Sequence, residues 1–582
     1  MTNAYQEKDA GSCSVLRRLA RFGAIVALGM LSLAWFFAAP PAYGQTAGDP
    51  TAVEELRRKQ RQLEEEDRRK RQAPEVQLEG EPRAAETFEL PAESPCFPIH
   101  TIVLEGEQSD RFSWLRDDVA PYVDKCIGRE GINLIVKRLM GRLIDRSYVT
   151  TRIGVPEQDI SSGVLRLALV PGVISDIRFA DEAMRGTWKT AFPSGRGDLL
   201  NLRDLEQGLE QMKRVPYQDV DLKIKPGVQP GESDVVLGVE REKAWRASLS
   251  LDDSGSTTTG KLQAGAGFAW DNPLGINDLL SLSWNHDAAT KHWLRRTGSE
   301  SMYYSVPYGY WTLSAQGSVS SYRQTVEGTV TSFQYSGTTR TADATVQRVI
   351  HRGRVSRTGL QFRLGKRESR TYLDDTEIEV QRREQADAEL GLFHRRSVGK
   401  ATVDVTAAFR KGVPWLNAQP DPAYSAPDGP TTRYKIGTLD VTTMIPFTLW
   451  SIPMQYRNRG RAQYTADRLL VADQFSIGNR YTVRGFDGAH TLLAERGWYL
   501  RNELGMPIFK TRQEFYLGID HGAVKGPSDE LLAGKSLTGG VIGVRGKYKG
   551  FFYDAFSGWP LRKPDGFRTE RPAAGFQVTW QY

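Results

Sequence analysis

Cysteine and histidine are scarce in this chain, which has three cysteines and seven histidines among 582 residues. Neither HExxH nor CxxC occurs, and the histidines show no spacing typical of metal ligands. We also find no nucleophile and base whose pattern would predict catalysis. The sequence therefore predicts no metal site and no other cofactor site, and it does not favour an enzyme.

Long apolar runs are absent after the N-terminal region, and 25% of the residues are charged. This composition excludes a bundle of transmembrane helices. It is compatible with a transmembrane β-barrel, because barrel strands place only alternate residues against lipid. The net charge of +7 is modest for the length, and no basic stripe accompanies a nucleic-acid-binding motif. We therefore expect no nucleic-acid partner.

Residues 1–44 have the pattern of a secretory signal peptide. Three arginines precede an apolar run over residues 22–39, and small residues follow before Gln45. The run is also long enough for an uncleaved membrane anchor, an alternative that the pattern leaves open. Either interpretation predicts that the rest of the chain is exported.

Residues 45–94 contain a strongly charged segment and a linker. Glutamate and arginine recur at helical spacing over residues 51–72, which predicts a solvated helix. The segment has no apolar face, so it cannot join a dry core. Residues 73–94 are rich in Pro, Glu and Ala and read as a flexible linker.

Residues 95–172 form a first small α+β module. We expect a strand over Ile99–Glu105, an amphipathic helix over Ile132–Asp145, and strands over Tyr148–Gly154 and Val164–Val170. This order predicts a small sheet with helices on one face.

The cysteines suggest one disulfide. Cys13 leaves with a cleaved signal, so Cys96 and Cys126 remain as an even pair in an exported chain, which favours a bond between them. The loop-closure entropy of about 30 residues would contribute about 3 kcal/mol. Two unpaired thiols are the alternative.

Residues 173–243 repeat this order without cysteines. Strands are expected over Val173–Phe179, Val220–Ile224 and Val235–Val239. A helix between the first two strands is marked by apolar residues at helical spacing: Leu202, Leu205, Leu209 and Met212.

From residue 244 to 582 the helical periodicity is replaced by short alternating segments separated by turn residues. The last residues show the alternation most clearly: Phe576, Val578, Trp580 and Tyr582 alternate with Gln577, Thr579 and Gln581. A soluble sandwich also alternates. Dense strands that are polar on one face and aromatic at their ends, in an exported chain, favour an antiparallel outer-membrane β-barrel.

Two motifs in this region are candidates for a functional contact. In Val483-Arg484-Gly485-Phe486 the glycine permits a tight turn, so the arginine can project from a loop tip. The segment from Phe515 to Gly522 predicts a strand with Asp520 on the side opposite its apolar residues. Taken alone, the arginine could lie on a surface turn and the aspartate could be hydrated by pore water.

Together, these features resemble a known family. The two modules resemble POTRA domains, and the wording Pro95-Cys96-Phe97-Pro98-Ile99 is similar to the ShlB-type version. The VRGF loop and the strand that carries Asp520 resemble motifs of the Omp85 superfamily. From about residue 95 to 582, the chain resembles ShlB/FhaC/HecB-like outer-membrane transporters of two-partner secretion.

The resemblance implies two POTRA domains followed by a sixteen-stranded barrel. The charged helix would lie in the lumen as a plug. Arg484 would pair with Asp520 on the inner wall, in the strand that also carries Gly522. In a water-filled lumen such a pair would contribute about 1 kcal/mol, weak enough to open as a latch.

The resemblance to this family also implies a function. The protein would lie in the outer membrane of a Gram-negative bacterium as a monomeric barrel in lipid, with its POTRA domains in the periplasm. These domains would bind the N-terminal secretion domain of one large adhesin- or haemolysin-like exoprotein. The alternatives are an Omp85-type assembly factor, and a barrel for ligand uptake or passive permeation.

Overall fold

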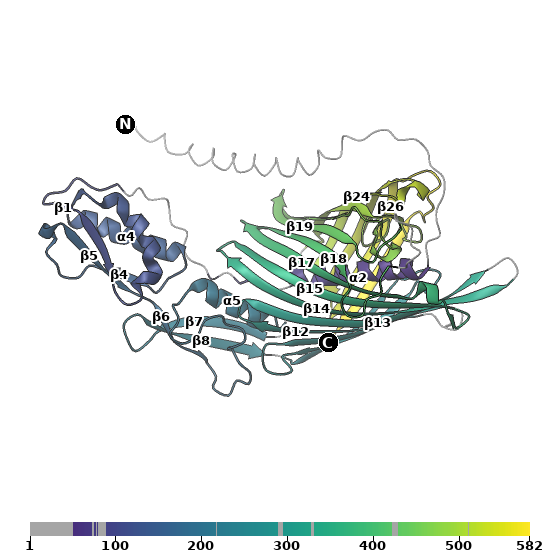
Figure 1. Cartoon of the computed structure of the whole chain (residues 1–582), viewed down its shortest axis with the longest axis horizontal. Helices are drawn as coiled ribbons and strands as arrows, with labels where there is room; N and C mark the ends of the chain where they lie inside the picture. Colours follow the sequence, from purple (N-terminus) through teal and green to yellow (C-terminus); the bar gives the residue numbers. More distant parts are fainter. Residues whose placement is uncertain are drawn as a thin grey trace.

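The computed structural model describes residues 50–72, 75–76, 78, 89–216, 218–241, 243–288, 295–327, 331–421, 429–509 and 511–582. The predicted signal peptide and most of the predicted linker lie outside these residues. Two small α+β modules lie in line at one end of a large barrel, and helix α2 (Pro50–Gln72) lies within the barrel (Figure 1). No helix in the described part of the chain is both long and apolar enough to cross a membrane.

The first module packs helices on a three-stranded sheet of order β2-β5-β4. Its strands are β2 (Thr101–Glu105), β4 (Arg152–Gly154) and β5 (Val164–Val170), and β2 lies parallel to β5. Helix α4 (Arg129–Asp145) buries its apolar face against the sheet, and the short helix α3 (Arg116–Val119) lies beside it.

The predicted strand over Ile99–Glu105 is confirmed over Thr101–Glu105, but its predicted start is wrong, because the chain changes sheets at His100. Strand β1 (Phe97–Ile99) pairs with an unpredicted strand, β3 (Lys125–Ile127), and β2 starts after His100. The backbone N–H groups of His100 and Thr101 both donate to the carbonyl of Gly163. This shared acceptor turns the chain from one sheet to the other.

Helix α4 starts three residues before the predicted Ile132. The Glu93 carboxylate accepts hydrogen bonds of 2.8 Å from the N–H groups of Gly128, Glu130 and Gly131. These groups have no partner within the helix, so the linker residue caps it. Partial desolvation opposes ionisation of this carboxylate, but the three hydrogen bonds outweigh it and lower the pKa of Glu93.

Two further predictions for this module concern the cysteines and the second predicted strand. Cys96 and Cys126 are joined by a disulfide with a Cα–Cα distance of 5.3 Å. Of the strand predicted over Tyr148–Gly154, only the last three residues form a strand, β4. Its first residue is held elsewhere, because the Tyr148 ring packs edge-on against Phe112 at 5.0 Å.

The second module has the sheet order β6-β8-β7. Its strands are β6 (Val173–Phe179), β7 (Gln218–Pro226) and β8 (Glu232–Arg241), the last two longer than predicted. Helix α5 (Leu202–Lys213) is capped by Asn201, whose side chain accepts from the N–H of Arg203. The apolar face of this helix packs on the sheet, yet its polar residues are also buried.

Sixteen antiparallel strands then form a closed barrel, in which β27 pairs with β9. The strands are β9 (Trp245–Asp252), β10 (Gln263–Asp271), β11 (Leu279–Asp287), β12 (Arg296–Tyr308), β13 (Trp311–Glu327), β14 (Ser332–Arg352), β15 (Ser356–Leu373), β17 (Arg383–Val398), β18 (Ala401–Val413), β19 (Lys435–Leu449), β20 (Ile452–Tyr464), β23 (Arg496–Pro507), β24 (Gln513–Lys525), β25 (Ser536–Tyr548), β26 (Phe551–Arg562) and β27 (Ala573–Gln581). The two-residue strand β16 (Thr376–Glu377) extends the wall beside β15.

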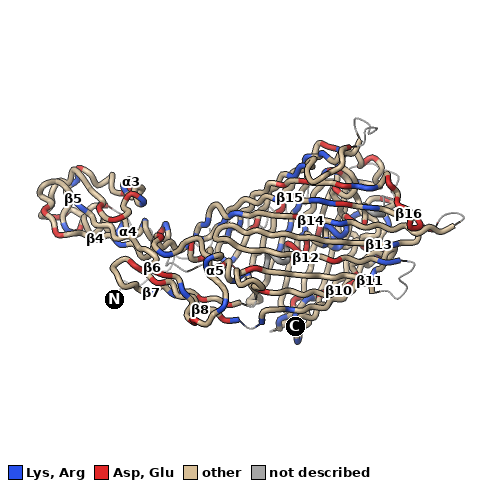
Figure 2. The backbone as a smooth tube through the Cα atoms, turned by 60° about the horizontal axis from the view of Figure 1, so that its bottom comes forward, with Lys and Arg blue, Asp and Glu red and all other residues tan. Residues whose placement is uncertain are grey.

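The two faces of the wall differ in chemistry. On β24, Leu517 and Ile519 are exposed on the outside, whereas Tyr516 and Asp520 are buried on the inside, as predicted. Charged residues are distributed along the strands of the barrel (Figure 2), and many of them pair across the inner face, as Arg363 does with Asp343 at 2.5 Å. The wall therefore presents apolar side chains to lipid and charges to the lumen.

Candidate functional site

The long connection between β20 and β23, residues 465–495, folds into the barrel. It carries a small hairpin of β21 (Phe475–Ile477) and β22 (Leu492–Ala494). Val483 and Phe486 are buried in an apolar cluster that joins this loop to the wall. The cluster also contains residues of the barrel and its outer loops: Tyr499, Val524, Leu532, Leu537 and Phe567. This apolar cluster therefore helps to hold the loop against the barrel wall.

Arg484 at the loop tip contacts the predicted wall residue, Asp520. Its Nε and Nη2 donate to the two carboxylate oxygens of Asp520 at 2.7 and 2.9 Å, and its backbone N–H donates at 3.0 Å. Nη1 donates to Glu503 at 2.6 Å. One arginine therefore joins the loop to strands β23 and β24 through two acids.

This contact is dry, contrary to the predicted water-filled setting. Arg484 is 5% exposed, Asp520 0% and Glu503 8%. The pair therefore does not belong with exposed ion pairs worth about 1 kcal/mol. Removing one partner of a buried pair leaves an uncompensated charge and costs about 3–5 kcal/mol.

Glu503 was not predicted as a site residue. It also pairs with Arg457 on β20 at 3.3 Å and with Arg545 on β25. Glu514 lies between the same two arginines, at 2.7 and 2.5 Å. A charge network thus runs across four wall strands behind the loop tip. The sequence did carry a signal for it, because Glu503 occupies the inward position of an alternating strand.

The wall opposite the loop tip is built from four glycines, Gly518, Gly522, Gly539 and Gly558, here called the glycine seat. A Cβ on Gly539 would lie 1.7 Å from the carbonyl oxygen of Arg484, and one on Gly522 would lie 3.0 Å from Cγ2 of Val483. Gly485 has a φ of +100°, which an L side chain rarely adopts. The loop backbone can reach the wall only because side chains are missing on both surfaces.

Helix α2 lies against the same loop. Arg57 donates to the carbonyl of Gly488 at 3.0 Å, and Asn479 donates to the side chain of Gln60 at 2.6 Å. Gln60 in turn donates to the carbonyl of Ser476 at 3.3 Å. The charged helix and the loop therefore contact each other inside the lumen.

The other sides of α2 contact the wall. Glu55 pairs with Arg367 at 3.1 Å, and Glu64 pairs with Arg501 at 3.4 Å and with Arg459. These contacts reach β15, β20 and β23, so the helix spans the lumen between distant strands. The helix predicted to be solvated satisfies its charges with those of the wall.

Helix α5 of the second module docks on the periplasmic rim of the barrel. The side chains of Gln207 and Gln211 each donate to the carbonyl of Gly309 at 3.1 Å, and the hydroxyl of Tyr310 donates to Asp204. Both Gly309 and Tyr310 belong to the turn between β12 and β13. The buried polar face of α5 is therefore covered by the barrel.

A second group of contacts brings the linker into this rim. Arg352, at the end of β14, donates to Glu210 at 2.8 Å and to the carbonyl of Val76 at 3.0 Å. The N–H of Leu78 donates to Glu206 at 2.8 Å. We call Glu206, Glu210 and Arg352, together with Val76, the rim joint. Val76 and Leu78 of the linker thus contact the barrel and α5, respectively.

Within the described residues, no group of three or more His, Cys, Asp or Glu side chains is placed to hold a metal ion. What the structure does contain is a membrane barrel whose lumen is filled by two segments of the same chain, with two small α+β modules docked at one rim. This combination defines a class: outer-membrane barrels preceded by POTRA domains.

Comparisons with known proteins narrow the class. Residues 231–546 match haemolysin secretion/activation protein ShlB/FhaC/HecB. Residues 97–172 match the ShlB-type POTRA domain, and residues 173–226 match a POTRA domain. The chain therefore belongs to the ShlB/FhaC/HecB family.

Individual relatives agree with this assignment. The chain is 43% identical over 514 residues to the outer membrane transporter CdiB-2 of Burkholderia pseudomallei, which covers 85% of this chain and 88% of the relative. It is 27% identical to the hemolysin transporter protein ShlB of Serratia marcescens, over 88% of this chain and 90% of the relative. The solved structure of CdiB from Escherichia coli superposes with a TM-score of 0.84 at 26% identity, covering 92% of this chain and all of that one (100%).

The protein is therefore an outer-membrane transporter of two-partner secretion, with its POTRA domains in the periplasm. This assignment is supported over the alternative of an assembly factor. The family is one of transporters, and it brings no positive sign of an enzymatic activity.

Proposed function

We propose that this transporter exports one cognate large exoprotein of the adhesin or haemolysin class, through a lumen that rests closed. The observation that carries the proposal is the double occupancy of the lumen by α2 and by the loop of residues 465–495. Helix α2 is held by polar contacts to the loop and to the wall, and the loop is held by its own polar contacts to the wall in addition to its apolar cluster. Such contacts can be exchanged for others when a polypeptide enters.

Capture of the exoprotein starts at the POTRA domains. In the second domain, β7 pairs on one side with β8 and forms an edge of nine residues within the described sheet. An extended segment of the partner's N-terminal secretion domain can add to such an edge through main-chain hydrogen bonds. Side-chain pockets along the edge would supply the selectivity for one partner.

The rim joint couples this capture to the plug. Arg352 holds the linker at Val76 and the helix α5 at Glu210 with the same guanidinium. A displacement of the second POTRA domain by its cargo therefore loosens the linker, and α2 follows the linker toward the periplasm. Folding of the exoprotein outside the cell then biases the direction of transport.

A single chain supplies the whole pore, because β27 pairs with β9 and closes the wall. The exposed apolar side chains of the strands provide the lipid contact. These features support a monomeric transporter in the outer membrane.

The closed state can be tested by fixing the plug. Cysteines at Gln60 and Asn479, whose side chains are hydrogen-bonded, would be joined by a short bifunctional maleimide in intact cells. Export of the exoprotein should stop after crosslinking. The control is the same treatment of Gln60→Cys alone. Undiminished export with α2 crosslinked to the loop would contradict the proposal.

A further inference from the structure

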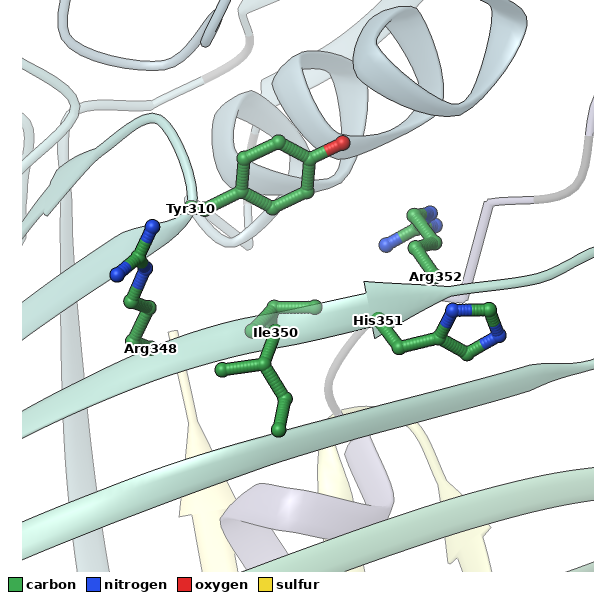
Figure 3. Close-up of a pocket in the computed structure, with 6 residues that line it drawn as sticks. Tyr310, Arg348, Ile350, His351 and Arg352 are labelled. Atoms are coloured by element: carbon green, nitrogen blue, oxygen red, sulfur yellow. The ribbon is translucent and has the colours of Figure 1, made fainter. Parts of the chain in front are cut away.

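A hollow of about 420 Å³ lies at the periplasmic rim of the barrel, beside the second POTRA domain. Its lining comes from β14 and the turn before β13: Tyr310, Arg348, Val349, Ile350, His351 and Arg352. In Figure 3, Arg348, Ile350 and His351 follow one another along β14, and Tyr310 lies in front of a helix. The register of β14 shifts between Val349 and His351, which marks a bulge at the hollow.

Arg348 faces the lipid rather than the lumen. The strand register places it directly beside Trp311 on β13 and Leu360 on β15, and both of these side chains are exposed on the outer face. Its guanidinium lies 4.9 Å from the centre of the Trp311 ring. An arginine on an outward tryptophan is typical of the headgroup level of a barrel.

The lipid-facing side chains of β14 locate Arg348 relative to the apolar band of the membrane. Only Ala342, Ala344 and Val346 separate Arg348 from the next outward charge, Arg340, eight positions away on the strand. At about 3.3 Å per residue these positions span about 26 Å along a tilted strand. Because barrel strands tilt by about 35–45°, these positions rise only about 18–21 Å across the membrane, so both arginines start just inside an apolar band of about 25 Å and their long side chains can reach its edges. Arg348 therefore marks the periplasmic boundary of the bilayer.

The hydrogen-bond donors Arg348 and His351 differ from the neighbouring Arg352 in their partners. Arg352 is neutralised by Glu206 and Glu210. Arg348 and His351, in contrast, have no hydrogen bond or ion pair with any residue that the structure describes, and both are exposed. The guanidinium and the imidazole are thus free to donate to an anion. Ile350, which is 52% exposed between them, offers an apolar contact.

We propose that this hollow binds the headgroup of an anionic phospholipid of the periplasmic leaflet. The phosphodiester accepts hydrogen bonds from Arg348 and His351, and an acyl chain follows Ile350 and the exposed Trp311 toward the bilayer. Basic pockets at the edge of a membrane domain recognise phosphate headgroups in this way. The site lies next to Tyr310 and Arg352, so a bound lipid also supports the docking of the second POTRA domain.

The proposal does not depend on export, because lipid binding requires no cargo. The full-length protein, purified in detergent, would be titrated with phosphatidylglycerol, phosphatidylcholine or inorganic phosphate, and bound molecules would be counted by native mass spectrometry. The test variant is Arg348→Gln. The control is Arg396→Gln, which removes an exposed arginine of β17 that has no ion pair with any described residue and does not line the hollow.

Phosphatidylglycerol should bind more tightly than phosphatidylcholine, and Arg348→Gln should weaken it about five-fold, as expected for one cation at a membrane surface. Arg396→Gln should leave this affinity unchanged. Equal losses in both variants, or equal affinity for both lipids, would overturn the proposal. So would binding of inorganic phosphate that depends on Arg348 and matches the lipid in affinity. Heat-modifiable migration of each variant on gels would show that its barrel is folded.

Discussion

Replacing Arg484 with alanine would remove the contact that joins the loop tip to the wall. Among the described residues, Asp520 would then accept hydrogen bonds only from the backbone N–H groups of residue 484 and of Asn502, at 3.0 and 3.3 Å. Glu503 would keep its own arginines, Arg457 and Arg545. Breaking a buried pair in this way costs about 3–5 kcal/mol. The ratio of displaced to docked loop would rise by about two orders of magnitude or more.

The geometry also predicts that variants of this contact differ in the size of their effect. Asp520→Ala leaves Arg484 with Glu503 at 2.6 Å, so its effect should be smaller than that of Arg484→Ala. Arg484→Lys keeps the charge but cannot reach two acids with a planar fork, and it should lie between the wild type and the alanine variant. A matched control is Arg480→Ala, which removes an arginine of the same loop that pairs with an outer-loop acid, Asp253, at 3.0 Å and lies 4.9 Å from the centre of the Phe556 ring, but contacts neither Asp520 nor Glu503 among the described residues.

The assay is the amount of exoprotein in the culture supernatant, normalised to the amount of folded barrel in the outer membrane. Because a released loop no longer keeps a defined position in the lumen, we expect export to fall strongly in Arg484→Ala while the barrel remains in the membrane. Export at the wild-type level in both Arg484→Ala and Asp520→Ala would refute the reasoning.

Three further predictions concern other contacts. Gly539→Ala would place a Cβ against the carbonyl of Arg484 and should lower export as Arg484→Ala does, whereas an alanine at Gly317 on β13, where the added Cβ would lie 3.9 Å from the carbonyl oxygen of Thr341, should have little effect on export. Glu210→Lys opposes Arg352 and should increase protease cleavage of the chain between the second POTRA domain and the barrel. Non-reducing peptide mapping should recover Cys96 and Cys126 in one linked fragment. Reduction should destabilise the first domain by roughly 3–4 kcal/mol for a loop of 30 residues; two free thiols in the untreated protein would contradict this prediction.

The sequence predicts which residues of a barrel strand face the lumen and which face the lipid. Successive side chains point to opposite faces, so one residue known to face inward determines the direction of the others in its strand. On β24 this rule alone places Asp520 inside and Ile519 outside. The tight turn at Gly485 likewise follows from the residue type. These are local properties, so a single chain segment is enough to predict them.

The rest depends on which strands become neighbours. Gly522 and Gly539 belong to different strands, and their shared role appears only when the register brings them under the loop tip. Glu503 joins the site for the same reason. The polar residues of α5, such as Glu206 and Gln207, look like a solvent-exposed face in the sequence, but the barrel rim and the linker residue Leu78 cover them. Sequence patterns report the burial of apolar faces much better than the burial of paired charges.

The most direct test of the account is a deletion of the gene, followed by a comparison of the culture supernatant with the outer-membrane protein profile. We predict the loss of one large exoprotein from the supernatant with the other barrel proteins unchanged, and restoration by the wild-type gene. A broad loss of barrel proteins would point to an assembly factor instead. No change in either fraction would contradict a role in secretion.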